Sequence, residues 1–474
     1  MNLPDYKHAK SRGKEQVKKE SYIYNDSYST LGLNKTYHVK TYGCQMNEHD
    51  SENIKAMLEQ LGFTEEDNYL KADLVLLNTC SIRENAHNKA FGMLGRLKHL
   101  KETKPDLLVG VCGCMAQEEG VAKELVTKFK WVNFVFGTHN LDQLPVILSR
   151  VLEEKTKELE IEVLSEEGNL IENIPVKRAN KFRAFVNIIY GCDKFCTYCI
   201  VPYTRGKERS RAKEDILTEV ESLVKEGYQE VTLLGQNVNA YGKDLPGSYY
   251  MENLLEDVAK TGIPRVYFMT SHPWDFTDNM VNVIAKFPNI MPSIHLPVQS
   301  GSNRILKLMG RRYTKEDYLT LFYKIKEKIP RVTISTDIIV GFPGETDEDF
   351  ENTVDLVNEC KFDNAFTFIF SKREGTPAAK MVDNISLDIK NQRLYRLNKI
   401  VNNYFLENNK KLEGQTVSVL VEGIRANKLG LYGYTDTKKL INIDSLDKDL
   451  IGKIISVEVT KAKTWSLDGK KVRD

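Results

Sequence analysis

The sequence contains no apolar run long enough to cross a membrane, which takes about 20 predominantly apolar residues in one helix. Its first residues, MNLPDYKHAKSRGKEQ, are charged and lack the apolar segment of a secretory signal. We therefore expect a cytoplasmic protein without membrane contacts.

An excess of charge of one sign is absent as well: 67 Lys and Arg residues oppose 66 Asp and Glu residues, and the formal net charge is +1. Overall charge thus gives no argument for nucleic-acid binding, and a basic surface would have to be a local patch. Cysteine is also scarce, with 8 residues in 474. So few cysteines in a chain of this size favour metal ligands over a disulfide framework.

Three of the cysteines lie within one short stretch, GCDKFCTYC, with the spacing C-x3-C-x2-C: Cys192, Cys196 and Cys199. We call them the central triad. A tight loop of this length can direct three thiolates to one point, and soft thiolate sulfur selects iron–sulfur clusters, zinc or copper(I). A structural zinc site needs four ligands, and no fourth Cys or His lies nearby in the sequence. Three thiolates on a four-iron cluster would leave one iron open for a substrate. The alternatives are a zinc site with a distant fourth ligand and three structural thiols.

With Tyr198 directly before its last cysteine, this motif resembles the signature of radical SAM enzymes. The resemblance implies a [4Fe–4S] cluster whose open iron binds S-adenosylmethionine. It also implies a 5′-deoxyadenosyl radical that abstracts an unactivated hydrogen. In such an enzyme the cofactor carries the chemistry, and the protein positions it and excludes water.

Apolar and polar patterns divide the chain into a flexible N-terminal extension over 1–34, a domain over 35–152, a linker over 153–180, a second domain over 181–410 and a third over 411–474. In the first domain we expect strands at 36–42, 74–79, 107–111 and 134–136, which alternate with helices at 48–61, 84–101 and 117–128. This β-α alternation predicts an α/β fold with a doubly wound, flavodoxin-like parallel sheet.

Cys44, Cys80 and Cys114 each follow one of these predicted strands, and we call them the N-terminal triad. In open α/β sheets the carboxyl ends of the strands share one edge, where ligands bind. Sequence-distant cysteines can therefore converge there on one metal centre. Three buried structural thiols are the alternative, since Cys is often buried. Cys114 is favoured over Cys112 because GCMAQ at 113–117 is similar to GCQMN at 43–47.

In the second domain, strands at 185–189, 230–234, 265–268, 291–296, 333–340 and 365–370 alternate with helices. Six such units predict a partial (β/α)6 barrel with its site at the carboxyl ends of the strands, where the central triad also lies. Polar residues and glycines near these ends could bind the amine, ribose and adenine of a cofactor; the candidates are Tyr198, Gln236, Asn237, Ser271, Gln299, Asp337 and Gly341.

The last segment changes character: short strands at 416–422, 431–433, 439–443 and 453–460 predict a small five-stranded, OB-like barrel. Basic side chains suited to RNA phosphates follow the central triad at Arg205, Lys207, Arg209 and Arg211, and lie in the barrel at Lys438, Lys439, Lys461 and Lys463. The alternatives are a solvated charge run at the start of a helix and a barrel that is a purely structural cap.

From about residue 35 onward, the chain resembles the methylthiotransferase family of radical SAM enzymes. The matching stretches are YGCQMN at 42–47, NTCSIRENA at 78–86, GCMAQ at 113–117 and the central triad. Those enzymes combine an N-terminal domain with three cluster cysteines, a radical SAM core and a C-terminal TRAM domain. Within the family, RENAHNKAFGMLGRLK and VPYTRGKERSR resemble the MiaB branch.

This resemblance implies transfer of a methylthio group to carbon 2 of N(6)-dimethylallyladenosine next to the tRNA anticodon. It further implies two [4Fe–4S] clusters, with the N-terminal triad on the one that holds the sulfur, and S-adenosylmethionine. The implied partners are a tRNA anticodon stem-loop and an electron donor such as flavodoxin or ferredoxin, and we expect a monomer. The alternatives are a methylthiotransferase for threonylcarbamoyladenosine or for a ribosomal protein aspartate, and, from another class, an iron–sulfur electron carrier or an RNA-binding module.

Overall fold

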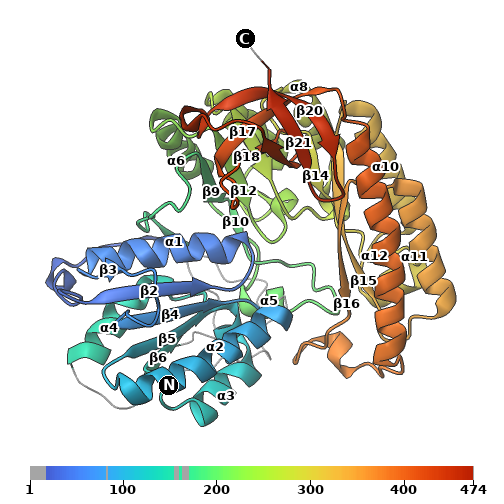
Figure 1. The fold of residues 1–474 in the computed structure, drawn as a ribbon. Helices are drawn as coiled ribbons and strands as arrows, with labels where there is room; N and C mark the ends of the chain where they lie inside the picture. The colour runs from blue at the N-terminus through green and yellow to red at the C-terminus, as the bar shows by residue number, and fades with distance from the viewer. Residues whose placement is uncertain (1–17, 82–83, 154–159, 163–169, 473–474) are drawn as a thin grey trace.

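The computed structural model describes residues 18–81, 84–153, 160–162 and 170–472. The chain forms an N-terminal α/β domain, a central α/β domain and a C-terminal β-barrel (Figure 1). In that view the N-terminal domain (blue) lies at the lower left and the C-terminal barrel (red) at the top, above the central domain. No helix within the described residues is both long and apolar enough to span a membrane.

The N-terminal domain is built on a parallel sheet with the strand order β3-β2-β4-β5-β6-β7. Helices cover both faces because β4 alternates its apolar side chains: Val75 and Leu77 pack with one set of helices, and Leu74 and Leu76 with the other. The strands are β2 (Thr36–Thr41), β3 (Thr64–Glu65), β4 (Leu74–Thr79), β5 (Leu108–Gly113), β6 (Phe134–Phe136) and β7 (Glu160–Glu162). The helices are α1 (Gln45–Gln60) and α4 (Leu144–Glu153) on one face and α2 (Glu84–Thr103) and α3 (Glu119–Lys128) on the other.

Residues predicted as a flexible extension and a linker are partly in regular structure, which corrects those two predictions. Strand β1 (Lys19–Ser21) pairs in parallel with β8 (Leu170–Glu172), and β7 extends the edge of the sheet. Tyr24 donates to the backbone carbonyl of Gln60 at 2.6 Å, so the segment after β1 is held on α1. The tyrosines of this segment pack against the apolar core of the N-terminal domain, which the polar composition of the segment does not indicate. Residues 1–17, 154–159 and 163–169 of the two predicted segments lie outside the described residues.

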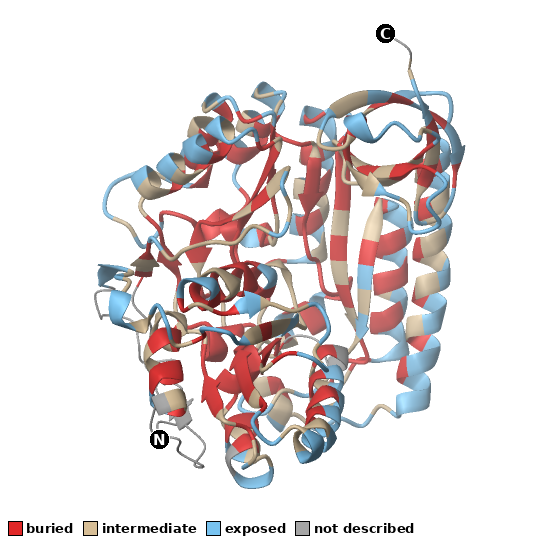
Figure 2. Ribbon diagram, turned by 60° about the vertical axis from the view of Figure 1, so that its left-hand side comes forward, coloured by how far each residue is buried: buried red, intermediate tan, exposed pale blue. Residues whose placement is uncertain are grey.

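The central domain contains the six predicted strands with ends shifted by a few residues. They form two parallel sheets, β13-β12-β9 and β14-β15-β16, which a bridge between Val266 and Ile290 connects. The strands are β9 (Arg183–Asn187), β12 (Glu230–Leu234), β13 (Arg265–Phe268), β14 (Ser293–His295), β15 (Thr333–Val340) and β16 (Asn364–Ile369). The helices include α6 (Lys213–Lys225), α7 (Met251–Lys260), α8 (Asp278–Lys286), α9 (Asn303–Leu308), α10 (Lys315–Lys328), α11 (Asp347–Cys360) and α12 (Leu387–Lys410). Figure 2 shows buried residues concentrated in the strands and exposed ones on the outer helix faces.

The C-terminal domain is a closed barrel with the strand order β17-β18-β19-β21-β20, which confirms the predicted small barrel. Its strands are β17 (Thr416–Ile424), β18 (Leu431–Thr435), β19 (Leu440–Ile443), β20 (Ile454–Ala462) and β21 (Leu467–Lys471). Polar contacts fix it to the amino ends of the central strands. Arg265 donates to the carbonyl of Tyr434 at 3.1 Å, and Arg183 pairs with Glu422 at 2.9 Å. Specific polar contacts therefore hold the barrel against the central domain.

Candidate active site

The loop that carries the central triad is held by its backbone. It follows β10 (Ile189–Tyr190), which pairs with β11 (Arg209–Ser210), and the N–H of Cys192 donates to the carbonyl of Gly206 at 3.1 Å. Gly191 adopts φ +74°, and a Cβ there would lie 1.9 Å from the carbonyl oxygen of Lys207. Only glycine fits this turn directly before Cys192.

Burial governs the chemistry of the central triad. It raises the pKa of Cys192 well above the usual range of a thiol and that of Cys199 to about 12, and the neighbouring thiols add to both shifts. The guanidinium of Arg311 donates to Cys196 Sγ at 3.6 Å. Because a metal ion displaces thiol protons, a metal centre would relieve the cost of keeping these sulfur atoms together.

In the N-terminal triad, Cys44 interacts with both Cys80 and Cys114. Cys44 caps α1, Cys80 follows β4, and Cys114 begins a short 3-10 helix after β5. A hydrogen bond from the Cys80 thiol, aided by the guanidinium of Arg205, lowers the pKa of Cys44 to about 6 in spite of burial. The three sulfur atoms thus share one electrostatic environment.

The two thiols of the CGC stretch have different surroundings. Cys112 packs in the apolar core with Leu74 and Leu76, and burial raises its pKa. Cys114 instead accepts a hydrogen bond of 3.2 Å from Arg205 Nε. The fold therefore separates a core thiol, Cys112, from a thiol in a polar site, Cys114.

All donor atoms of the two triads are thiol sulfur. Among the residues that the structure describes, no group of three or more His, Cys, Asp or Glu side chains is suited to hold a single ion. In an iron–sulfur cluster each thiolate binds a different iron, so its ligands need not approach one point as closely as those of zinc. The donor set, three thiols in each of two sites, fits iron–sulfur clusters.

Two of the predicted cofactor-binding residues present unsatisfied polar atoms near the central triad. Asn237 Nδ2 donates to Asp275 at 2.7 Å, and Asp275 also pairs with Lys194 of the triad loop at 2.7 Å. The Asn237 Oδ1 and Ser271 Oγ atoms are buried without a hydrogen-bond partner. Because buried polar groups are nearly always satisfied, such atoms fit the contact surface of a polar ligand.

The remaining cofactor candidates fall into two groups. Tyr198, Gln299 and Asp337 line a cavity of about 450 Å³ that also contains Cys199 and Phe368, which we call the thiol-side cavity. Gln236 and Gly341 instead serve the protein itself. The backbone N–H of Gly341 donates to Glu345 at 2.7 Å, and Gln236 accepts from the N–H of Gly191 at 2.6 Å.

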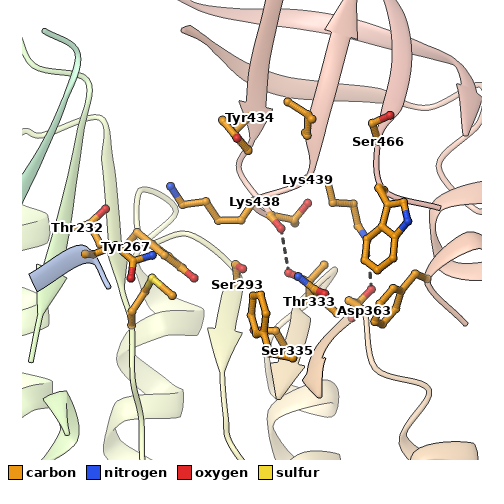
Figure 3. Close-up of a pocket in the computed structure, with 18 of the residues that line it drawn as sticks. Thr232, Tyr267, Ser293, Thr333, Ser335, Asp363, Tyr434, Lys438, Lys439 and Ser466 are labelled. Atoms are coloured by element: carbon orange, nitrogen blue, oxygen red, sulfur yellow. Dashed lines mark hydrogen bonds and ion pairs between the residues drawn. The ribbon is translucent and has the colours of Figure 1, made fainter. Parts of the chain in front are cut away.

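A second cavity of about 600 Å³ lies inside the curved sheets of the central domain, and we call it the inner cavity. Figure 3 shows the strands contributing Thr232, Tyr267, Ser293 and Ser335, while the C-terminal barrel contributes residues from the other side. Gln45, directly after Cys44, also lines it. The cavity thus extends from the C-terminal barrel toward the N-terminal triad.

Three of the four predicted RNA contacts after the central triad have internal partners in the structure. Arg205 is buried against Asp50, Arg209 donates to the carbonyl of Arg205 at 3.0 Å, and Arg211 pairs with carboxylates of Glu172 and Glu219. Lys207 is only half-buried. Arg205 and Arg211 belong to internal ion pairs whose acidic partners include residues from distant parts of the chain.

In the C-terminal barrel, Lys438 and Lys439 are likewise engaged internally. Lys438 pairs with Glu230 and lies over the ring of Tyr267, 4.6 Å from its centre, and Lys439 donates to Asn409 at 2.8 Å. Both lysines, which the sequence predicted as RNA-binding candidates, therefore already have partners within the protein. Lys463 pairs with Asp468 at 2.6 Å but stays 47% exposed, and Lys461 is exposed.

The sequence reading missed an open hollow on this barrel. Its volume is about 460 Å³, and its lining combines a cation, two aromatic rings and amides: Arg425, Ala426, Asn427, Tyr432, Tyr434, Leu440 and Asn442. Tyr434 and Leu440 also line the inner cavity, so the two spaces adjoin. In the sequence, the signal for this hollow was an alternating pattern along two neighbouring strands. Tyr432 and Tyr434 lie in β18, and Leu440 and Asn442 lie in β19.

Each of the three domains matches one family description. Residues 186–357 match the radical SAM superfamily, residues 36–137 match the uncharacterized protein family UPF0004, and residues 410–472 match the TRAM domain.

Among solved structures, the chain is similar in fold to the radical S-adenosylmethionine methyltransferase TsrM from Kitasatospora setae with tryptophan substrate and a SAM analog bound. That match has a TM-score of 0.53 and 14% identity and covers 73% of this chain and 75% of the other. The cobalamin-dependent S-adenosylmethionine radical enzyme OxsB gives a TM-score of 0.50 at 12% identity, over 79% of this chain and 56% of the other. At such identities these matches bear on the fold alone.

Curated relatives are far more similar. A tRNA-2-methylthio-N(6)-dimethylallyladenosine synthase of Staphylococcus epidermidis is 52% identical over 474 residues, covering 99% of this chain and 92% of the relative. The Staphylococcus saprophyticus protein of the same name is 53% identical over 469 residues, covering 98% and 91%. The chain therefore belongs to the tRNA-2-methylthio-N(6)-dimethylallyladenosine synthase family of radical SAM enzymes.

Proposed function

We propose that this enzyme replaces the hydrogen on carbon 2 of N(6)-dimethylallyladenosine, next to the anticodon of tRNA, with a methylthio group. The observation that carries the proposal is the presence of two thiol triads in a chain that is 52% identical to curated synthases. Gln236 contacts Gly191, which precedes Cys192, and Met46, which lies two residues beyond Cys44. The triads therefore belong to one site between two domains.

Each triad is assigned one [4Fe–4S] cluster. Cys192, Cys196 and Cys199 would hold the cluster that binds S-adenosylmethionine, and Cys44, Cys80 and Cys114 would hold the auxiliary cluster. When bound, these groups supply the radical and the sulfur that substitution of an inert C–H bond requires. Cys80, Cys114 and Cys196 are buried, which limits the access of water to both sites.

Residues of the central domain would orient the cofactor. The unsatisfied Asn237 Oδ1 and Ser271 Oγ support this role, as do Tyr198, Gln299 and Asp337 on the wall of the thiol-side cavity. Gln236 and Gly341 act indirectly, since their polar groups already bind the protein. Phe366 lines the inner cavity and Phe368 lines the thiol-side cavity, so β16 contributes side chains to the walls of both cavities.

The RNA would dock on the C-terminal barrel. Single-stranded RNA is bound by aromatic stacking and cationic contacts, and the hollow of Arg425 and Tyr432 offers both. This hollow adjoins the inner cavity at Tyr434, so RNA bound there would lie beside that cavity. Lys461 and Lys463 remain candidates for additional phosphate contacts.

The proposal also covers the fold of two domains, the oligomeric state, the location and the electron donor. The strand order β3-β2-β4-β5-β6 supports a flavodoxin-like N-terminal domain, and the six strands from β9 to β16 support a partial (β/α)6 barrel. We further propose a monomeric, cytoplasmic enzyme that receives electrons from a donor such as flavodoxin or ferredoxin.

Iron analysis with electron paramagnetic resonance tests the two-cluster assignment, and mass spectrometry tests the substrate. We expect about eight irons in the anaerobically reconstituted protein and about four after replacement of the central triad by alanine, because each triad holds one four-iron cluster. A central-triad variant without iron would refute the N-terminal cluster. The intact enzyme should methylthiolate an anticodon stem-loop that carries dimethylallyladenosine, and preference for the unmodified or the threonylcarbamoyl form would contradict the proposed reaction.

A further inference from the structure

Arg205 belongs to the central domain but its guanidinium lies in the N-terminal triad's site. It follows α5 (Val201–Thr204), six residues after the last cysteine of the central triad. Its Nε donates to Cys114 Sγ at 3.2 Å and its Nη2 to Asp50 Oδ2 at 2.6 Å, and the residue is only 5% exposed. A fixed positive charge from one domain thus contacts a cysteine of the other.

The central triad has a counterpart in Arg311, which is also buried. Its Nη1 donates to Cys196 Sγ at 3.6 Å, while its Nη2 donates to the carbonyl of Pro297 at 2.9 Å and its Nε to Tyr313 Oη at 2.8 Å. Each triad therefore carries one buried guanidinium that a second protein group anchors. By contrast, the buried Arg211 binds carboxylates of Glu172 and Glu219 and the carbonyl of Asn187.

We propose that Arg205 sets the reduction potential of the auxiliary cluster and that Arg311 sets that of the central cluster. This inference rests on the proposed assignment of one cluster to each triad. Hydrogen bonds to cluster sulfur and nearby positive charge stabilise the reduced, more negative state, so each arginine raises the potential of its own cluster. Both act as positioning residues through a cysteine ligand.

The origin of Arg205 gives the arrangement a second consequence. The auxiliary site receives its cation only when the central domain is docked, because Asp50 and Cys114 come from the N-terminal domain and Arg205 does not. Thr138 supports the docked state, since its hydroxyl donates to the carbonyl of Thr204 at 2.6 Å. The auxiliary cluster's potential is therefore tied to contact between the two domains.

Potentiometric titration followed by electron paramagnetic resonance tests the proposal in two backgrounds of the full-length, reconstituted protein. Replacement of the central triad by alanine isolates the auxiliary cluster, and replacement of the N-terminal triad isolates the central cluster. In the first background we expect Arg205→Gln to lower the midpoint potential and Arg205→Lys to lower it less. In the second background we expect Arg311→Gln to lower the potential, while Arg205→Gln leaves it unchanged.

Arg211→Gln is the matched control, because it also removes a buried guanidinium but none that the structure places on a thiol. Iron content and the thermal unfolding midpoint are measured for each variant. If the Arg205→Gln variant holds no iron, the potential of the Arg205→Lys variant tests the proposal instead. An unchanged potential with iron retained would overturn the proposal, and so would an equal shift in the Arg211 variant. Absence of iron in the first background before any Arg205 change would instead refute the cluster assignment itself.

Discussion

The side-chain carbonyl of Gln236 accepts a hydrogen bond of 2.6 Å from the backbone N–H of Gly191. The same side chain donates through Nε2 to the sulfur of Met46, in the first turn of α1. Gly191 precedes the central triad and Met46 follows the first cysteine of the N-terminal triad. One amide from the central sheet thus joins the loops that carry both sets of thiols.

Loss of this amide should impair both halves of the reaction. We expect Gln236→Ala to slow S-adenosylmethionine cleavage and methylthio transfer by about tenfold each, since two hydrogen bonds of roughly 1 kcal/mol are lost near the reacting groups. Single-turnover assays of both products check this. Gln229→Ala removes only a partly exposed contact with the carbonyl of Gly227 and should change neither rate. Impaired methylthio transfer with normal cleavage would contradict a brace that serves both loops.

The two cysteine triads could be proposed from the sequence because their placement is mostly local. The central triad lies in one loop, and the N-terminal triad follows successive strands whose carboxyl ends must share an edge. The choice of Cys114 over Cys112 also followed from a local pattern and stays a prediction, while Cys112 packs in the apolar core.

The basic residues were harder to interpret because their partners are distant in the sequence. Arg205 pairs with Asp50, and Lys438 pairs with Glu230, so neither charge is available to a phosphate. A sequence shows how many cations a segment has but not which of them meet a buried carboxylate. For the same reason the hollow at Arg425 became visible only when β18 and β19 were seen side by side.

The two clusters should be separable by single cysteine substitutions. Cys80→Ala should abolish methylthio transfer but retain S-adenosylmethionine cleavage, because it removes a ligand from the auxiliary cluster and leaves the central triad intact. Cleavage is measured as 5′-deoxyadenosine formed under reducing conditions, and transfer as methylthiolated RNA. Cys112→Ala is the matched control, since it changes an equally buried thiol that packs in the core, and it should retain both activities. Loss of both activities in a folded Cys80 variant would contradict two separate clusters.

The hollow on the C-terminal barrel should dominate RNA affinity. Because stacking on an aromatic ring contributes about 1–3 kcal/mol per base, Tyr432→Ala should weaken binding of an anticodon stem-loop by about tenfold or more. Arg425→Ala should weaken it and also reduce the dependence of affinity on salt, by roughly 0.7 in the logarithmic slope for a single strand. Fluorescence anisotropy at several salt concentrations measures both effects. The control is Lys470→Ala, an exposed cation of the same barrel outside the hollow, and equal losses in all three variants would refute a localised contact.

Glu118, at the start of α3, should make the stability of the protein depend on pH. Burial raises the pKa of this carboxyl to about 7, although Ser81 and Arg373 oppose the shift and Glu374 adds to it. In the unfolded chain the group releases its proton near pH 4.5, so between pH 4.5 and 7 the folded state binds more protons. Stability therefore falls as pH rises through this interval, by roughly 3 kcal/mol once the carboxylate is fully ionised.

The substitution Glu118→Gln removes that titration while preserving the shape of the side chain. Its unfolding midpoint should be close to that of the parent protein at pH 5 and above it at pH 8, and the difference should grow across the interval. Thermal unfolding of the reduced, metal-free protein at several pH values measures the difference directly. Glu119→Gln provides the control, because it changes the adjacent carboxyl, which lies at the protein surface and pairs with Lys123 at 2.6 Å. If the gain of the Glu118 variant were the same at pH 5 and pH 8, the carboxyl would have an ordinary pKa in the folded state.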